Sequence, residues 1–335
     1  MLNIDNKEYH PINSLVSKKN TSFCTDVLRG LKQNLKQLPS KYFYDKKGDK
    51  IFQEIMNAQE YYPFNCELEI FSHQTQALAK SIMAQGDGFD LIELGAGDCT
   101  KSKYLLKYLT EIGADFTFMP IDISENIITY LESHLPSEIP GLQLIGLNGE
   151  YFKMLKKASR ISNRRKVILF LGSNLGNMVS EEVDSFCLEL RAKINKGDIV
   201  IVGMDLKKSP AVILAAYNDK EGITRRFNLN LLKRINKELQ GNFDCAKFEH
   251  FPTYDPLSGD CKSYLVSLEK QSVQLKGENG YEQIEIDEGE SIFMEVSHKF
   301  TRDEVLELGI KSGFETLGNY YDKKGWFLDT LWHAV

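Results

Sequence analysis

The chain has 335 residues, enough for about two domains, and its 42% apolar and 26% charged residues are close to globular averages. A formal net charge of −6 gives no general attraction to nucleic acid or anionic membranes, which require a cationic face. No apolar run approaches the roughly 20 residues that span a bilayer, and the first residues are too polar for a signal peptide.

The six cysteines are scattered, without the paired spacing of a zinc site or a disulfide framework, and the histidines form no metal-ligand pattern. We therefore expect a cytoplasmic protein with free thiols and no metal, without a nucleic-acid or membrane partner.

Up to about residue 65 the sequence is helical in pattern and rich in aromatic residues. Because proline biases the preceding residue away from helical geometry, we expect a helix to stop just before Pro63. From about 66 to 207, short apolar runs alternate with amphipathic stretches, which predicts parallel β-α-β units with strands buried on both faces. The runs are 89–94, 116–121, 142–147, 167–171 and 198–204, and the helical stretches are 101–109, 125–134 and 181–194.

After residue 207 this alternation ends. Residues 210–239 are predicted to form one or two helices. Antiparallel strands are expected at 264–268, 282–286 and 292–297, separated by turns such as 287–289.

The last segment is predicted to return to the first sheet. Thr301 and Glu304 form a capping box that begins a helix running to about residue 313. Strands at 314–320 and 326–332 then form a reversed hairpin. S-adenosylmethionine-dependent enzymes of the common α/β class end in this way, whereas nicotinamide-binding domains usually end in further parallel strands. The fold class expected is therefore a doubly wound, Rossmann-like (class I) methyltransferase sheet with a terminal antiparallel hairpin.

The first strand ends in a glycine-containing loop that suits a cofactor. Gly95 and Gly97 allow the backbone to turn tightly against a ligand, and the third glycine of the dinucleotide fingerprint is absent. The next strand ends at Asp122, which can accept hydrogen bonds from two ribose hydroxyls. Asp122 could instead cap the following helix, although Ser124 is the better candidate for that cap.

Two further polar groups follow later strands. After the third expected strand come Glu150 and Tyr151, where methyltransferases commonly contact adenine, and Asn177 follows the fourth. Carboxyl ends of consecutive strands are where open α/β sheets bind ligands.

Taken together, these segments resemble the L-histidine Nα-methyltransferases of ergothioneine biosynthesis, part of a family that includes fungal N-methyltransferases of a prenylated tryptophan. The resemblance covers essentially the whole chain. It rests on residues 41–45, Gly48, 51–52, 60–63, 93–97, Lys101, Asp122, 170–172, 176–177, 216–219, 222–224, 227–228, 295–297 and 299–300, which match in order.

The resemblance implies a discontinuous α+β substrate-binding domain, residues 1–65 and 208–298, and a methyltransferase domain, residues 66–207 and 299–335. Carried over by position, the cofactor-binding residues are Gly95, Gly97, Lys101, Asp122, Glu150 and Tyr151. Asn177 and Tyr217 would hold the carboxylate and neighbouring backbone groups of the substrate, and Glu295 and Ser297 would bind its imidazole. Tyr44, Phe52 and Tyr61 would close the pocket near the amine, with Tyr44, Tyr61 and Asn177 as the candidates for catalytic residues.

One departure from the family concerns the adenine position. This chain has Gly149, Glu150 and Tyr151 there, whereas the family has Gly-Asp-Phe, which puts the role of Glu150 in more doubt than that of Asp122.

The chemistry fits an amine acceptor. Methyl transfer from a sulfonium requires a neutral amine, so hydroxyl and amide groups suit better than a carboxylate beside it. Glu295 and Ser297 stand two apart on a predicted strand and so share a face, and a carboxylate with a hydroxyl can satisfy both imidazole nitrogens.

We therefore predict trimethylation of the α-amino group of histidine by a monomer. The alternatives are N-methylation of another amino acid or amine, such as an indole amino acid, and a non-catalytic S-adenosylmethionine-binding protein.

Overall fold

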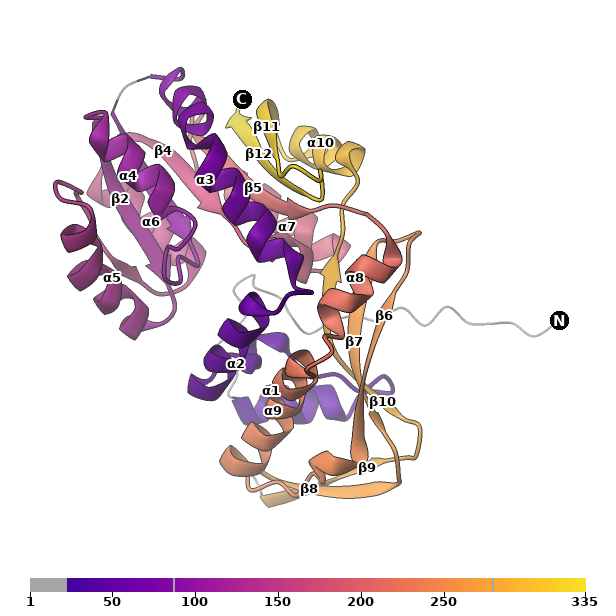
Figure 1. Cartoon of the computed structure of the whole chain (residues 1–335). Coiled ribbons are helices and arrows are strands. Elements are labelled where there is room, and N and C mark those ends of the chain that lie inside the picture. The colour runs from indigo at the N-terminus through magenta and orange to yellow at the C-terminus, as the bar shows by residue number, and fades with distance from the viewer. Residues whose placement is uncertain (1–22, 87, 279) are drawn as a thin grey trace. The chain divides into compact units, whose positions relative to one another are not determined.

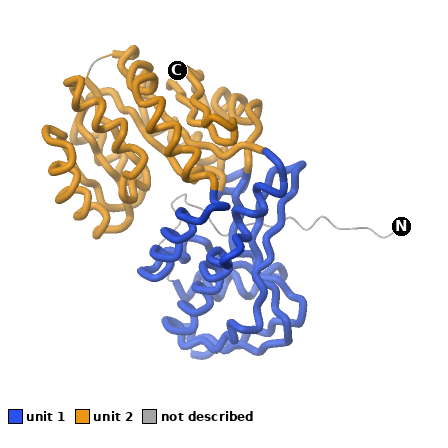
Figure 2. The backbone as a smooth tube through the Cα atoms, viewed as in Figure 1, with its two compact units in different colours: residues 1–61, 177–182, 208–298 blue, residues 62–176, 183–207, 299–335 orange. Residues whose placement is uncertain are grey.

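The computed structural model describes residues 23–86, 88–278 and 280–335. The chain forms two compact units, shown in separate colours in Figure 2. Unit 1 contains the described residues up to 61 together with 177–182 and 208–298, and unit 2 contains 62–176, 183–207 and 299–335. Each unit is discontinuous in sequence, so the chain leaves and re-enters both of them.

Unit 2 is built on a seven-stranded sheet with the order β11-β12-β5-β4-β1-β2-β3. Strands β1 to β5 are parallel, whereas β12 runs antiparallel to both β5 and β11. The bounds are β1 Phe89–Leu94, β2 Phe116–Asp122, β3 Leu147–Asn148, β4 Arg165–Phe170, β5 Ile199–Asp205, β11 Phe314–Tyr321 and β12 Phe327–Ala334 (Figure 1). The predicted doubly wound sheet with a terminal antiparallel hairpin is confirmed.

Burial explains the apolar runs, since every residue of β1 and β5 is buried. Successive strands lie on opposite sides of β1, with β2 and β3 on one side and β4 and β5 on the other. Ligands of open α/β sheets bind at the carboxyl ends of the strands where the order reverses in this way.

The third strand is much shorter than predicted. The run 142–147 pairs with β2 through an isolated bridge between Leu144 and Phe118, and continuous pairing occurs only at Leu147 and Asn148. The amide of Gly146 donates to the carboxylate of Glu132 at 3.1 Å. This contact with a helix side chain interrupts the strand ladder.

The helices of this part of the chain are α3 Tyr62–Met83, α4 Lys103–Glu111, α5 Glu125–Glu138, α6 Tyr151–Ile161, α7 Ser180–Ala192 and α10 Arg302–Lys311. The capping box of Thr301 and Glu304 is present at the start of α10. The expectation that a helix stops before Pro63 is wrong, because α2 ends at Asn57 and Pro63 lies in the first turn of α3. Proline is tolerated there because the first amides of a helix have no intrahelical acceptor.

Unit 1 combines helices with antiparallel strands. Its helices are α1 Phe23–Leu31, η1 Ser40–Phe43, α2 Lys46–Asn57, α8 Pro210–Tyr217, α9 Ile223–Glu238 and η3 Cys245–Lys247. A three-stranded sheet has the order β10-β7-β6, and β8 and β9 form a hairpin. The bounds are β6 Phe248–Tyr254, β7 Asp260–Ser267, β8 Gln271–Gly277, β9 Gly280–Ile286 and β10 Ser291–His298.

The core of unit 1 collects the apolar faces of α1, α2 and α9 and of the strands. Strands β7 and β8 alternate buried and more exposed residues, as expected where one face of a sheet covers a core. No helix in the described ranges is long and apolar enough to cross a membrane.

Candidate functional site

The loop after β1 has the backbone that its glycines predict. Gly95 and Gly97 have φ values of +72° and +52°, and Cys99 also adopts a positive φ of +56°. The amides of Gly95 and Ala96 both donate to the carbonyl of Ile121, at 2.8 and 3.2 Å. The cofactor loop is thereby attached to the end of β2.

Asp122 at the end of β2 is oriented by two backbone amides. One carboxylate oxygen accepts from the Gly97 amide at 3.2 Å and the other from the Ser124 amide at 2.9 Å. Ser124 is the helix cap, since its hydroxyl accepts from the Ile127 amide. Asp122 is therefore not needed as a cap, and its remaining acceptor sites suit a ligand that carries hydroxyls.

Tyr151 lies against the cofactor loop. A Cβ on Gly95 would come within 2.8 Å of the Tyr151 hydroxyl oxygen, so a side chain at position 95 would require Tyr151 to shift. Burial and the charge of Asp122 raise the pKa of Tyr151 to about 12. Glu150, by contrast, has its carboxylate 3.4 Å from Lys153 on α6.

Sequence reasoning missed Ile123 as a ligand candidate. This side chain directly follows Asp122 and is 82% exposed. An isolated apolar side chain on a surface is ordinary, but next to the predicted ribose acceptor Asp122 it could offer a face for a base. Its position immediately after the strand-ending acid is the signal that would have found it.

Lys101 contacts a buried acidic residue that the sequence did not single out. The Lys101 ammonium forms an ion pair with Glu67 of α3, whose carboxylate also accepts from the Gly172 amide at 2.8 and 2.9 Å. Glu67 thus connects the loop after β1 with the loop after β4.

A second buried carboxyl group lies beside Glu67. A methyl group on Gly203 of β5 would overlap the Glu67 carboxylate and would meet an oxygen of Asp329 at 3.1 Å. Asp329 is fully buried on β12, opposite Gly203. Burial and the negative charge of Glu67 raise the pKa of Asp329 well above its ordinary value.

The residues predicted to close the substrate pocket are joined by ring contacts within unit 1. Tyr44 packs edge-on against Phe52 with centroids 5.5 Å apart, Phe52 contacts Tyr61 at 6.5 Å, and Tyr61 contacts Tyr217 at 6.4 Å. Asp45, next to Tyr44, caps α2 through the Gly48 amide. The structure therefore brings these four aromatic side chains into one continuous row.

The row continues to β10. The Tyr217 hydroxyl donates to the Ser297 hydroxyl at 2.7 Å, and the Tyr217 carbonyl lies 3.0 Å from Nε2 of His250. Glu295 and Ser297 pair in register with Ser263 and Cys261 of β7, two positions apart. They share a face of β10, as the sequence predicts.

Asn177 is the last residue of a short 3₁₀ helix, η2 Asn174–Asn177, that follows β4. Its side chain is exposed, and α7 begins three residues later at Ser180. This position does not make it the cap of α7, which leaves its amide for the predicted role at the substrate.

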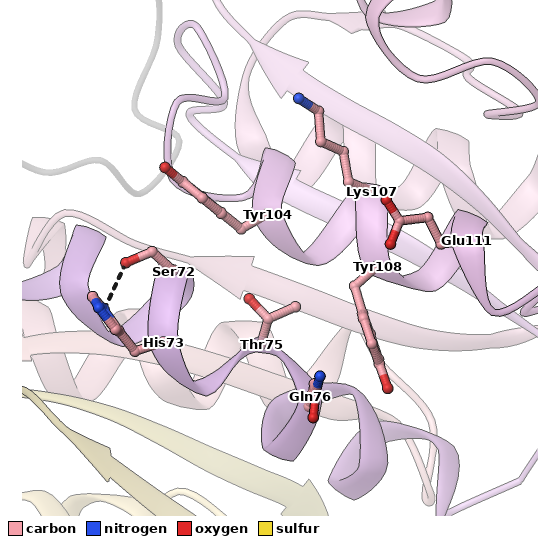
Figure 3. A pocket seen from close by; sticks show the side chains of 8 residues that line it. All are labelled: Ser72, His73, Thr75, Gln76, Tyr104, Lys107, Tyr108 and Glu111. Carbon is pink, nitrogen blue, oxygen red and sulfur yellow. Dashed lines mark hydrogen bonds between the residues drawn. The ribbon is translucent and has the colours of Figure 1, made fainter.

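A surface pocket between α3 and α4 has different lining residues (Figure 3). In it, the Ser72 hydroxyl lies 3.0 Å from Nδ1 of His73. None of the predicted site residues lines this pocket, which is formed by Ser72, His73, Thr75, Gln76, Tyr104, Lys107, Tyr108 and Glu111.

Comparison with known proteins settles the family. A family model described as a histidine-specific, S-adenosylmethionine-dependent methyltransferase matches residues 23–334. The chain belongs to this methyltransferase family. The match covers both units and both groups of predicted site residues.

Three named methyltransferases or biosynthesis proteins are similar to this chain in sequence. A protein of Mycobacterium tuberculosis named histidine N-alpha-methyltransferase is 30% identical over 90% of this chain and 92% of its own length. Ergothioneine biosynthesis protein 1 of Schizosaccharomyces pombe is 28% identical over 87% of this chain but 38% of its own length. The 4-dimethylallyltryptophan N-methyltransferase of Claviceps fusiformis is 25% identical over 57% of this chain.

The residues after β1 and β2 fit S-adenosylmethionine. A Cβ on Gly97 would meet nothing within 4 Å, so the loop leaves space for a ligand beside the Asp122 carboxylate. Asp122 offers acceptors for ribose hydroxyls and Ile123 an apolar face for adenine, while Lys101 offers a cation for the amino-acid end of the cofactor.

Proposed function

We propose that this methyltransferase transfers methyl groups from S-adenosylmethionine to the α-amino group of L-histidine, giving the trimethylated betaine hercynine for ergothioneine biosynthesis. The family match and the names of its relatives support the reaction class. The observation that carries the choice of substrate is the pairing of Glu295 with Ser297 on one face of β10, with the Ser297 hydroxyl held by Tyr217.

This pair suits an imidazole. A neutral imidazole has one nitrogen that donates and one that accepts, and a carboxylate and a hydroxyl satisfy both. The hydrogen bond from the Tyr217 hydroxyl to the Ser297 oxygen fixes the position of the Ser297 hydroxyl beside Glu295 on β10. A side chain without two ring nitrogens would leave one of these groups unpaired, which strongly disfavours it.

The aromatic row suits the amine. When bound, S-adenosylmethionine supplies a methyl group on a positively charged sulfur, and the protein aligns the acceptor with it, which can contribute roughly 7–11 kcal/mol. Tyr44 and Tyr61 offer hydroxyls and ring faces without a negative charge that would hold the amine protonated. Ring faces also attract the quaternary ammonium of a trimethylated product.

Asn177 and Tyr217 are proposed to hold the substrate carboxylate and neighbouring backbone groups. The Asn177 amide can donate to a carboxylate without adding a positive charge beside the amine, and the Tyr217 oxygen, whose proton points to Ser297, can accept from a backbone N–H of the substrate. Substrate binding is thus assigned to residues 1–65 and 208–298, and cofactor binding to 66–207 and 299–335.

One observation favours a different methyl acceptor, namely that Glu150 and Tyr151 differ from the family's Asp and Phe at these positions. Tyr151 packs on Gly95 while Glu150 contacts Lys153, so this part of the loop has its own arrangement. N-methylation of another amino acid, such as an indole amino acid, is the alternative that it supports. A cytoplasmic location and a monomeric state remain predictions from the sequence.

The test is methyl transfer by the purified full chain to each member of an amino-acid panel, followed by mass spectrometry. We expect histidine to gain up to three methyl groups and tryptophan to gain none. Methylation of another amino acid with histidine unchanged would favour the alternative. Calorimetric binding of S-adenosylmethionine without turnover on any amine would instead indicate a non-catalytic binding protein.

A further inference from the structure

Three buried polar side chains of unit 2 form a cluster that no predicted role uses. The hydroxyl of Tyr62 donates to the carboxylate of Asp205 at 2.8 Å, and the Lys299 ammonium contacts the same carboxylate oxygen at 2.8 Å. Tyr62 is 7% exposed, and Asp205 and Lys299 are fully buried. The cluster therefore contains an ion pair and a phenol removed from water.

Each member of the cluster stands where the chain passes from one unit to the other. Tyr62 is the first residue of unit 2 after Tyr61, and Lys299 is the first residue of unit 2 after residue 298. Asp205 ends β5, two residues before the chain leaves unit 2 at residue 207.

Backbone contacts bind the same segments together. The Phe300 amide donates to the Asp205 carbonyl at 2.9 Å, and the Lys207 amide donates to the Phe300 carbonyl at 2.8 Å. The Asp205 amide donates to the hydroxyl of Ser173, in the loop that leads to Asn177, at 3.0 Å. The carboxylate of Asp205 and its own backbone thus contact three of the passing segments.

Stability alone gives little reason for such a cluster. Taking two charges out of water is costly, and well-packed apolar residues of similar volume are often equally or more stable than a buried ion pair. What an ion pair with a hydrogen-bonded phenol supplies is fixed geometry, because each group must meet its partner at one distance and orientation.

We propose that Tyr62, Asp205 and Lys299 are positioning residues for histidine, acting through their chain neighbours Tyr61 and Ser297. The proposal rests on the proposed function, in which Tyr61 lies near the amine and Ser297 binds the imidazole. Tyr61 is bonded directly to Tyr62, and Ser297 precedes Lys299 by two residues. The cluster fixes the chain on unit 2 immediately beside both substrate residues.

The first variant is Tyr62→Phe, which removes one hydroxyl and keeps the ring. We expect kcat/KM for histidine to fall by about tenfold, because small displacements of aligned groups reduce rates strongly. The Kd for S-adenosylmethionine, measured by calorimetry, should stay within about twofold, since the hydrogen bond and the ion pair of the cluster involve none of the predicted cofactor residues.

Tyr320→Phe is the matched control. The Tyr320 hydroxyl is also in unit 2, is similarly buried, and bonds to the Ser81 hydroxyl at 2.7 Å and the Ala77 carbonyl at 3.2 Å. Neither Ser81 nor Ala77 is a residue at which the chain changes unit, so loss of the Tyr320 hydroxyl should lower stability while leaving KM for histidine unchanged. Equal kinetic losses in the two variants, or none in Tyr62→Phe, would overturn the proposal.

Hydrogen exchange provides a readout that does not depend on the substrate. In Tyr62→Phe and in Lys299→Met, amides of residues 58–66 and 294–300 should exchange faster than in Tyr320→Phe. If the variants exchange faster but the wild-type chain does not methylate histidine, the proposed function is refuted and the anchoring role stands. Unchanged exchange in both segments would refute the anchoring role whatever the substrate.

Discussion

The Tyr217 hydroxyl donates a 2.7 Å hydrogen bond to the Ser297 hydroxyl, and this contact joins two residues with separate predicted tasks. Tyr217 is assigned to the backbone groups of histidine and Ser297 to its side chain. The bond holds the Ser297 hydroxyl in one place on β10. A substitution of Tyr217 is therefore expected to displace the Ser297 hydroxyl as well.

Glu295→Ala should selectively impair use of histidine. Losing a charge-assisted hydrogen bond costs about 1.5–3 kcal/mol, so kcat/KM should fall by roughly 10- to 100-fold, with the Kd for S-adenosylmethionine unchanged. Glu285→Ala, an exposed carboxylate on β9, is the control and should leave turnover intact. Steady-state kinetics measure both, and normal histidine turnover in Glu295→Ala would remove its assigned role.

Alanine substitutions at Gly95 and Gly97 should distinguish backbone strain from crowding by a neighbouring side chain. Gly95→Ala combines a positive φ with a close approach to the Tyr151 hydroxyl, whereas Gly97→Ala has the positive φ alone. The conformational term is about 1–2 kcal/mol at each position. Gly95→Ala should therefore be the more destabilising change in chemical denaturation.

Removing the Tyr151 hydroxyl tests whether crowding by this group explains the greater destabilisation by Gly95→Ala. Gly95→Ala is expected to lose more unfolding free energy than Gly97→Ala. In a Gly95→Ala, Tyr151→Phe double variant this difference should shrink, because the added methyl group then has room. If the double variant were as unstable as the sum of its single changes, crowding by Tyr151 would not be the reason.

Replacing the buried carboxyl groups of Asp329 and Glu67 by amides should change the unfolding free energy by very different amounts. Burial and the charge of Glu67 disfavour the ionised form of Asp329, so Asp329→Asn should change the unfolding free energy by less than about 1 kcal/mol. Glu67→Gln leaves the Lys101 ammonium without its anionic partner and should cost about 3 kcal/mol. Urea denaturation at neutral pH compares them, and equal losses would show that Asp329 is ionised.

Glu93, buried at the end of β1, should make stability depend on pH. Burial raises its pKa from 4.5 to about 7, although the Ser102 hydroxyl donates to it at 2.6 Å. Because the folded state binds the proton more tightly than the unfolded state, unfolding free energy falls as pH rises from about 4.5 to about 7. The full loss is about 3 kcal/mol.

Glu93→Gln should remove this dependence, since the amide stays neutral. The variant and the wild type should be similar in stability near pH 5, with the variant more stable near pH 8. Urea denaturation across this pH range measures the difference, and parallel curves would mean that Glu93 titrates normally in the fold.

Apolar patterning predicted the central strands because β1, β2, β4 and β5 are buried on both faces and therefore consist of nearly continuous apolar residues. It did not predict α3 or α6, and it mistook the role of Pro63. Pro63 could be interpreted as a stop or a start, and only the tertiary packing of α3 decides which. Strands β6 and β8 were also missed, because their alternating residues include many polar side chains.

The candidate site was predictable only where the chemistry is local in sequence. The loop at Gly95 and Gly97 and the spacing of Glu295 and Ser297 are such cases. The contact between Tyr62 and Asp205 joins residues 143 positions apart, and that between Gly172 and Glu67 joins residues 105 apart. No pattern of spacing identifies such partners, which are set by the order of strands in the sheet.

The interleaving of the two units constrains how this protein is made. β12 lies between β5 and β11, so the sheet of unit 2 cannot be completed until β12 has left the ribosome. Unit 1 likewise requires both its early helices and β10, which are separated by most of unit 2. No single cut of the gene therefore separates the residues of one unit from those of the other.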